Sequence, residues 1–448
     1  MRKVLILITS LVITTIGFSQ ETTTSFSLQE AIDYALENNR QVKNAVRDVA
    51  AAKEQKRETT ATGLPQIDGN INYQNFLKQQ VQVVPGEIFG GTPGEFIPVL
   101  FGTEQSASAS VTLNQLIFDG SYIVGLQSTK VFLEISKNAK EKTKLQVRES
   151  VINAYGNVLL AEESEAIFSK NRDVLWKNLE ETTKIFENGL EEEESVEQLQ
   201  ITLSGIESLL KNATRLKNIA YQMFNITIGI DINTSSVLTD TLENLALSSI
   251  SLDLLNAEET IENNMDYKIA ENDKVSKELL VKLEKSKALP QVSGFINAGY
   301  LGYDNEFNFL KSSQEWYGFS SFGVNVNIPI FSSLGRTAKT QRTKIELEIT
   351  EENLSELEQQ LKLEIARAKS NYQFSIEDYE VKKQNLRLAE RIESKNQTKF
   401  FEGIASSFDL RQAQTQLYNA QSEYLEAMFD VINTKATLEM ALNTITIN

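Results

Sequence analysis

The chain of 448 residues contains no cysteine and no histidine. Without cysteine it can form neither disulfides nor thiolate metal sites, and it has no thiol nucleophile. Without histidine it lacks the commonest general base and the commonest metal ligand. Its formal net charge of −17 argues against a nucleic-acid partner, because phosphate binding needs clustered Lys and Arg. We therefore expect no enzyme, no cofactor and no metal centre.

Long apolar runs are also scarce. The chain begins "MRKVLILITSLVITTIGFSQ", where Arg2 and Lys3 precede an apolar stretch, Val4–Ile16, that is too short to span a bilayer. The small residues Gly17 and Ser19 follow it, so residues 1–19 are predicted to be a signal peptide. The sequence thus predicts an exported protein that could cross a membrane only with strands.

The rest of the chain consists of two internal sequence repeats. The tripeptide "LPQ" at Leu64–Gln66 recurs at Leu289–Gln291, and Phe186 with Gly189 recurs as Phe400 with Gly403. We predict a first structural repeat at 20–235 and a second at 236–448, each with a helix, two strands, a long helix, a glycine turn and a helix. The predicted strands are 65–84, 104–118, 290–302 and 316–331, and the turns are at 189 and 403.

The helical stretches have coiled-coil spacing. Alternating steps of three and four residues from Leu410 to Ala441 meet one polar residue, Thr434. The helices predicted at about Ser121–Asn188 and Ser333–Glu402 would each be ~100 Å long at the rise of an α-helix. Helices of this length exceed a compact domain of this mass, so most of their surface needs neighbours.

The predicted strands alternate between two faces. In "SASASVTLN", Ser106–Asn114, small polar residues share one face and apolar residues share the other. This pattern is typical of a transmembrane barrel with a wet lumen, although the edge of a soluble sandwich shows it too. Four strands cannot close a barrel, because single-chain membrane barrels need about eight or more. Closure must then be shared between chains, and three copies would supply twelve strands whereas two would supply a narrow eight.

Several stretches resemble the signature of TolC-like outer-membrane efflux proteins. Phe186-x-x-Gly189 and Phe400-x-x-Gly403 each precede a polar turn and a Gln-rich helix. "LPQ" stands before the first strand of each pair, and "LIFDGSY" or "PIFSSLGR" follows the second. "SFDLRQAQTQLYNAQSEYLEA" is close to the second hairpin of this family. The resemblance covers nearly the whole mature chain, in order and in both halves.

The resemblance implies a mixed α/β membrane protein with a long-helix coiled-coil α-barrel and a transmembrane β-barrel, four strands per chain. It implies a homotrimer in the outer membrane of a Gram-negative bacterium, with a helical tunnel in the periplasm. The implied function is the passive channel of a tripartite efflux or secretion system, which carries drugs, toxic small molecules or proteins. A periplasmic adaptor and an inner-membrane transporter would be its partners.

The resemblance also points to residues at the periplasmic end. Family members narrow their entrance with aspartates just after the second turn, where this chain has one aspartate and one glutamine. The expected entrance residues are Asp409, Gln412, Glu191, Glu192, Glu193 and Glu194. The expected turn and adaptor-contact residues are Gly189, Gly403, Phe186 and Phe400.

Other interpretations of these residues stay open at this point. The acidic run Glu191–Glu194 also fits an ordinary solvated helix start, since carboxylates suit a helix N-terminus. Ser195 and Asp409 both fit N-cap or first-turn positions. A periplasmic coiled-coil adaptor or scaffold without a pore is the alternative function, although two hairpins with two strand pairs argue against it. A glycosidase would need a positioned carboxylate pair, and none stands out.

Overall fold

The computed structural model describes residues 24–257 and 260–443, so the predicted signal peptide, 1–19, lies outside the described residues. The chain divides into two compact units, and each takes segments from both sequence repeats. The strand unit consists of Ala50–Ile135 and Glu271–Asn353. The helical unit consists of the chain up to Val49, Ser136–Ala270 and the chain from Leu354.

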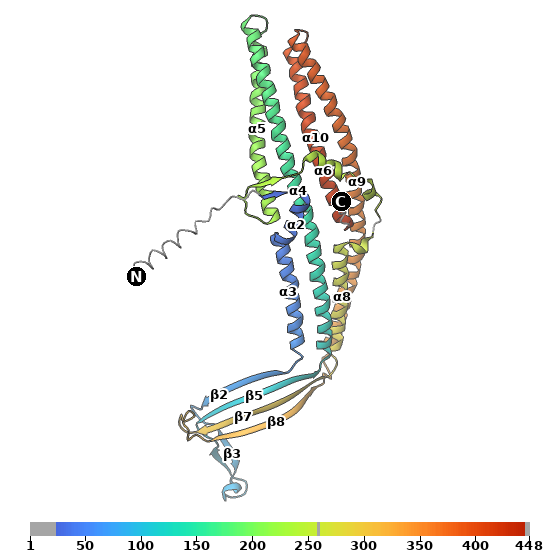
Figure 1. Cartoon of the computed structure of the whole chain (residues 1–448). Helices are drawn as coiled ribbons and strands as arrows, with labels where there is room; N and C mark the ends of the chain where they lie inside the picture. Colours follow the sequence, from blue (N-terminus) through green and yellow to red (C-terminus); the bar gives the residue numbers. More distant parts are fainter. Residues whose placement is uncertain (1–23, 258–259, 444–448) are drawn as a thin grey trace, which may run out of the picture. The chain divides into compact units, whose positions relative to one another are not determined.

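An antiparallel sheet of four strands forms the centre of the strand unit (Figure 1). Its strands, in spatial order, are β2 (Gln66–Asn75), β5 (Gln105–Phe118), β7 (Gln291–Asp304) and β8 (Trp316–Asn327). β5 and β7 come from different repeats and form the central pair. β8 ends earlier than the predicted 316–331, because Pro329 has no N–H to continue a strand ladder.

The register of the sheet separates an apolar face from a polar face, as the alternating sequence predicts. One cross-strand row on the apolar face is Ile67, Leu113, Ile296 and Phe322. The adjacent row on the polar face is Asp68, Thr112, Asn297 and Ser321. The apolar face is uncovered in the single chain, where the side chain of Phe322 is 87% exposed and that of Ile71 is 86% exposed.

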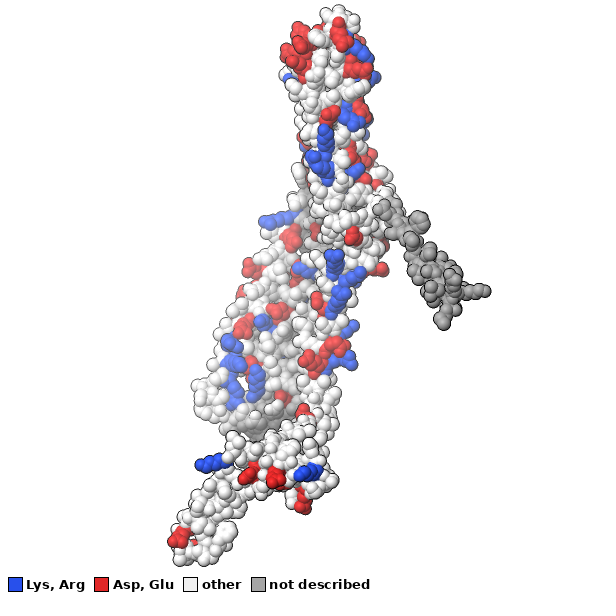
Figure 2. Space-filling view, turned by 90° about the vertical axis from the view of Figure 1, so that its left-hand side faces the viewer, with Lys and Arg blue, Asp and Glu red and all other residues white. Residues whose placement is uncertain are grey.

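Charge is nearly absent from this sheet. The charged residues of its four strands are Asp68 in β2 and Asp304 at the end of β7. The surface at the lower end of Figure 2, over the strands, is accordingly mostly white. An uncharged and outward-facing apolar surface is what a strand needs to meet lipid.

A second, two-stranded sheet lies between β2 and β5 in the sequence. β3 (Val81–Pro85) pairs with β4 (Phe96–Leu100), and the 3-10 helix η2 (Gly86–Phe89) follows β3. The strand predicted as 65–84 is therefore two strands, because the chain leaves the main sheet after Asn75 and pairs again within its own loop. Alternation alone could not show this break, since both strands have apolar residues at every second position.

Two long helical hairpins make up most of the helical unit, as the heptad spacing predicts (Figure 1). The helices are α4 (Gly120–Glu187) with α5 (Glu193–Ile228) and α9 (Gly335–Phe401) with α10 (Ser407–Leu442). The first parts of α4 and α9 belong to the strand unit. The predicted seam is packed, since Leu410, Val431 and Leu438 of α10 are at most 1% exposed. Within the described residues, no helix is long and apolar enough to cross a bilayer.

Two further helices, α3 (Arg40–Ala61) and α8 (Met265–Ser286), precede the strand pairs of the two repeats. The order α3, β2, β5, α4, α5 thus recurs as α8, β7, β8, α9, α10. Each of these two helices extends from the helical unit into the strand unit.

Short elements pack beside the hairpins of the helical unit. They are β1 (Thr24–Phe26), α2 (Leu28–Asn38), β6 (Ser236–Leu238), α6 (Leu242–Ser249), α7 (Leu252–Leu255) and η3 (Ile261–Asn263). β1 and β6 pair in parallel, although they come from different repeats. Asp240 Oδ2 accepts hydrogen bonds from the Leu28 N–H and the Tyr155 hydroxyl, both at 2.8 Å. Burial raises the pKa of Tyr155, so its hydroxyl remains a donor.

Candidate functional site

Both hairpins reverse direction on a glycine. Gly189 and Gly403 each have a φ of +72°, in the left-handed region where glycine ends helices at little cost. In the first turn, the Gly189 N–H donates to the Phe186 carbonyl at 2.8 Å, and the Leu190 N–H donates to the Ile185 carbonyl at 3.1 Å. This pair of bonds is a Schellman motif, which ends the helix on a left-handed residue at the glycine where the sequence predicts a turn.

The second turn repeats the pattern. The Gly403 N–H donates to the Phe400 carbonyl at 2.9 Å, and the Ile404 N–H donates to the Lys399 carbonyl at 2.8 Å. The residue after each glycine is aliphatic and projects into solvent, with Leu190 79% and Ile404 70% exposed. These two side chains were not predicted from the sequence. Their one signal was an apolar residue directly after the repeated glycine.

The phenylalanines before the two glycines differ in their surroundings. Phe186 is 37% exposed and reaches the surface of the first turn. Phe400 is 6% exposed, and its ring packs edge-on against Phe401 with 5.4 Å between ring centroids. Phe400 therefore supports the second turn from within, whereas the side chain of Phe186 is partly exposed to solvent.

Replacing Gly403 with alanine is expected to destabilise the protein by about 1–2 kcal/mol per chain, the cost of a left-handed conformation for a residue with a Cβ. Apart from the glycine and its chain neighbours, no heavy atom lies within 4 Å of the position a Cβ would take, so the cost is conformational and does not come from a clash with other residues. Gly205→Ala, inside α5 and equally uncrowded, is the matched control and should stabilise the helix by about 0.5–1 kcal/mol. The measurement is the midpoint of thermal unfolding in detergent. Equal midpoints for the two variants would contradict the assignment.

The acidic run forms the start of α5. Glu192 is the N-cap residue, and the next two glutamates make up the first turn. Glu191 accepts a hydrogen bond from the Ser195 hydroxyl at 2.7 Å, and Glu194 accepts one from the Gln198 amide at 2.8 Å. Negative side chains suit this position, because the helix dipole places positive charge at the N-terminus. The run therefore has a structural role whether or not it also faces an entrance.

Asp409 lies in the first turn of α10 and forms a capping box with Ser406. The Ser406 hydroxyl and N–H donate to Asp409 Oδ2 at 2.7 and 3.0 Å, and the Asp409 N–H donates to Ser406 Oγ at 3.2 Å. The bonds from the Ser406 side chain and backbone lower the pKa of Asp409, so its exposed carboxylate stays ionised in more acidic solution than an ordinary aspartate. Capping and charge thus coexist at this residue.

Gln412 faces a groove of about 1010 Å³ between α9 and α10. Phe408 and Arg411 line the same groove, with the Arg411 guanidinium 5.3 Å from the centroid of the Phe408 ring. Gln412 is thus near the start of α10 but lines a groove within one hairpin.

Side chains connect the first turns of α5 and α10. The Ser407 hydroxyl donates to Gln198 Oε1 at 3.4 Å, and the amide of the same Gln198 donates to Glu194. Glu194 of the first hairpin and Ser407 of the second are therefore joined through Gln198, and Asp409 lies two residues after Ser407 in the same first turn of α10. Red atoms gather at the upper end of Figure 2, where this unit ends in its hairpin turns.

The main sheet of the strand unit has two edges without a partner strand among the described residues. β2 pairs with β5 alone and β8 pairs with β7 alone. Because all neighbours in this four-stranded sheet are antiparallel, β2 and β8 also run in opposite directions. The β8 edge of one copy therefore matches the β2 edge of another for antiparallel pairing.

In the part of the chain that the structure describes, no group of three or more Asp and Glu side chains is placed to hold a metal ion. The features that stand out are instead surfaces: two hairpin turns, an acidic end and an open-edged sheet.

Comparison with known proteins identifies the family. A family model described as outer membrane efflux protein matches residues 31–224 and 256–444. Outer membrane protein TolC of Vibrio cholerae serotype O1 is 22% identical over 426 residues, which cover 94% of this chain and 91% of TolC. This match, like that of the family model, extends over both sequence repeats.

Solved structures show the same fold. The outer membrane protein VceC of Vibrio cholerae superposes with a TM-score of 0.71 at 15% identity, over 93% of this chain and 96% of VceC. The CmeC outer membrane channel of Campylobacter jejuni superposes with a TM-score of 0.72 at 17% identity, over 93% of this chain and 85% of CmeC. Nothing in these comparisons favours an adaptor without a pore. The chain belongs to the outer membrane efflux protein family, whose members are efflux channels in the outer membrane of Gram-negative bacteria with a helical tunnel in the periplasm.

Proposed function

We propose that three copies of this chain close into one duct, with a twelve-stranded barrel made of three four-stranded sheets. The observation that carries this proposal is the sheet with an uncovered apolar face and two edges that have no partner strand among the residues the structure describes. In lipid, each unpaired N–H or C=O group costs several kcal/mol, so an open sheet cannot persist there. Head-to-tail contacts between β8 of one copy and β2 of the next form a closed ring.

The duct conducts passively, and its energy comes from a partner. A periplasmic adaptor and an inner-membrane transporter deliver drugs, toxic small molecules or proteins to the tunnel. The two glycine turns are the proposed contact sites for the adaptor, because Leu190 and Ile404 present exposed aliphatic side chains there. Gly189, Gly403 and Phe186 belong to the same surface, and Phe400 supports it from inside.

The entrance of the duct is acidic in this proposal. Asp409 and the run Glu191–Glu194 line it, and Gln412 lies about one turn further along α10. The ionised carboxylates favour cations by focusing negative potential into a narrow throat. Opening requires the hairpin around Gly403 to swing outwards, which exchanges helix packing between neighbouring chains. The bond from Ser407 to Gln198 is one contact that such a swing would break.

Neutralising the acidic residues is expected to reduce the cation preference of the channel severalfold. The variant combines Asp409→Asn with Glu→Gln at Glu191–Glu194, which removes five negative charges per chain while keeping side-chain size. The measurement is the reversal potential in a salt gradient across planar bilayers, with block by divalent cations as a second readout. Ser406→Ala is the control, because it removes the capping partner and keeps every carboxylate.

The two variants separate charge from helix capping. A lower cation preference in the neutralised channel, with wild-type preference in Ser406→Ala, supports the acidic entrance. Unchanged preference and unchanged block in the neutralised channel refute it, whereas the trimeric duct itself would stand as long as the protein conducts.

A further inference from the structure

The first turns of α9 carry an unusual concentration of positive charge. The sequence from residue 335 to 345 contains Arg336, Lys339, Arg342 and Lys344 and no acidic residue, in a chain whose formal net charge is −17. The corresponding stretch at the start of α4, residues 120–130, contains one basic residue, Lys130, and no acidic residue. The concentration of positive charge therefore belongs to this strand-to-helix connection and is not a shared property of the duplicated fold.

An apolar surface lies directly before these four basic residues. Ile330 is 89%, Phe331 82% and Leu334 73% exposed. The side chains of Phe322, Val324, Val326, Ile328 and Ile330 follow one another at every second position, and all are more than half exposed. The apolar face of β8 thus continues past the end of the strand and reaches the basic start of the helix.

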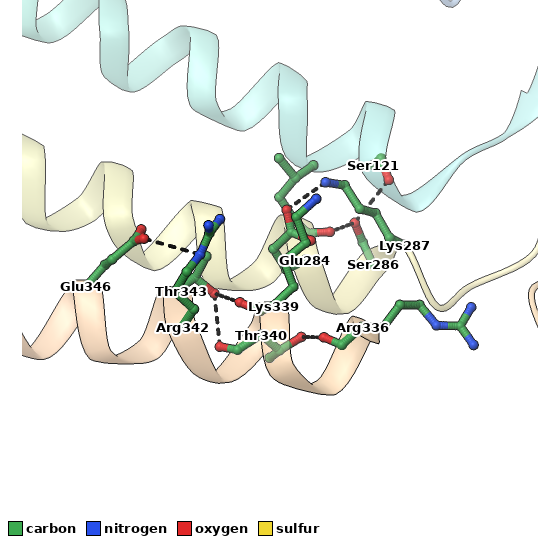
Figure 3. Close-up of polar contacts among 11 residues, drawn as sticks. Ser121, Glu284, Ser286, Lys287, Arg336, Lys339, Thr340, Arg342, Thr343 and Glu346 are labelled. Atoms are coloured by element: carbon green, nitrogen blue, oxygen red, sulfur yellow. Dashed lines mark hydrogen bonds and ion pairs between the residues drawn. The ribbon is translucent and has the colours of Figure 1, made fainter. Parts of the chain in front are cut away.

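The structure leaves most of this positive charge uncompensated. Arg342 Nε lies 3.5 Å from Glu346 Oε1, and Arg336 donates to the Ile330 carbonyl at 3.4 Å. Within the described residues, Lys339 and Lys344 have no ion pair. Figure 3 shows the Arg336 guanidinium pointing away from the other labelled residues.

The other polar groups near the start of α9 are already satisfied. The Thr340 and Thr343 hydroxyls bond to carbonyls of their own helix, and Lys287, the residue after α8, pairs with Glu284 at 2.6 Å (Figure 3). The Ser286 and Ser121 hydroxyls lie 3.5 Å apart, where α8 and α4 meet. Within the described residues, Arg336, Lys339 and Lys344 thus have no anionic partner, and Arg342 has only a solvent-exposed pair with Glu346.

We propose that the basic start of α9, Arg336, Lys339, Arg342 and Lys344, binds the headgroups of anionic phospholipids in the periplasmic leaflet of the outer membrane. Apolar side chains that end where basic side chains begin match the boundary between acyl chains and phosphates. The helix N-terminus adds a favourable dipole for the same anions. This inference rests on the outer-membrane location of the family and not on the trimer.

The test is lipid retention by the full-length protein. Wild-type protein reconstituted in vesicles of equal phosphatidylglycerol and phosphatidylcholine is extracted in mild detergent, and the bound lipids are quantified by mass spectrometry. We expect enrichment of phosphatidylglycerol, and at least tenfold less enrichment after Arg336→Gln, Lys339→Gln, Arg342→Gln and Lys344→Gln together, since each basic residue near an anionic surface contributes severalfold. Arg336→Lys with Arg342→Lys keeps the charge and should keep the enrichment.

The matched control removes four charges from the same helix in the helical unit: Arg387→Gln, Arg391→Gln, Lys395→Gln and Lys399→Gln. This control should retain phosphatidylglycerol as the wild type does. Equal loss in both quadruple variants would overturn the proposal, because it would reflect net charge alone. Unchanged enrichment in the first variant, or displacement of the lipid by equimolar inorganic phosphate, would overturn it too.

Discussion

Covalent trimers are expected when one cysteine is placed on β2 and another on β8. The natural chain has no cysteine, so every disulfide formed reports on the two introduced thiols. Asn70 of β2 and Ser321 or Asn325 of β8 all lie on the polar face of the sheet. Neighbouring strands are about 4.8 Å apart, which brings facing Cα atoms within the range that a disulfide requires. Testing two β8 positions against Asn70 samples the register between chains.

The readout is the mass of the oxidised protein on a denaturing gel. A double variant whose cysteines face each other across chains should run as a trimer, with dimers as the partly oxidised product, and should return to monomer on reduction. The single variants, Asn70→Cys or Ser321→Cys alone, should stay monomeric, because a head-to-tail contact never brings two copies of the same strand together. A product of two chains that never proceeds to three would refute the trimer.

The elements whose apolar residues recur with a short period in the sequence were the most predictable. The faces of β2, β5, β7 and β8 follow from alternation, because successive side chains of a strand point in opposite directions. The seam of α10 follows from its heptad spacing, and Leu410 and Leu438 are buried as expected. In both cases each residue's environment depends on its immediate neighbours in the chain.

Contacts between segments that are far apart in the chain leave no periodic pattern in the sequence from which they could be predicted. The Leu28 N–H bonds to Asp240, and β1 pairs with β6 over a similar separation in the sequence. Neither the aspartate nor the short strands differ locally from loop residues, so the elements beside the hairpins were not predicted. The break between β2 and β3 was missed for the same reason, because pairing partners and not alternation decide where a strand ends.

The candidate site, too, could be predicted from the sequence only in part. The glycines were predictable, since a single glycine that interrupts long helical spacing indicates a left-handed helix end. The hydrogen bonds of Asp409 were not, because a residue that fits a first-turn position by sequence can cap the helix, face a lumen or do both. The structure adds the capping box with Ser406 and the connection from Ser407 to Gln198. It also shows Leu190 and Ile404 as exposed side chains at the turns.

Phe322→Arg is expected to abolish assembly of the channel in the outer membrane. Phe322 lies in the middle of β8 on the outward apolar face, where it is 87% exposed in the single chain. Arginine at the midplane of a lipid-facing strand costs about 2–4 kcal/mol, and a trimer carries this cost three times. The measurement is the amount of heat-modifiable trimer in isolated outer membranes, which should fall to background.

Ser321→Arg is the matched control, because it introduces the same side chain one residue away on the opposite face. Ser321 shares its row with Asp68, Thr112 and Asn297, so an arginine there points towards the polar side of the sheet and can be hydrated. This variant should assemble at close to the wild-type level. If both arginines were tolerated, β8 would not face lipid, and if both prevented assembly, the loss would come from disturbing the strand itself. A difference between two adjacent residues can arise only if the two faces of this sheet meet different solvents.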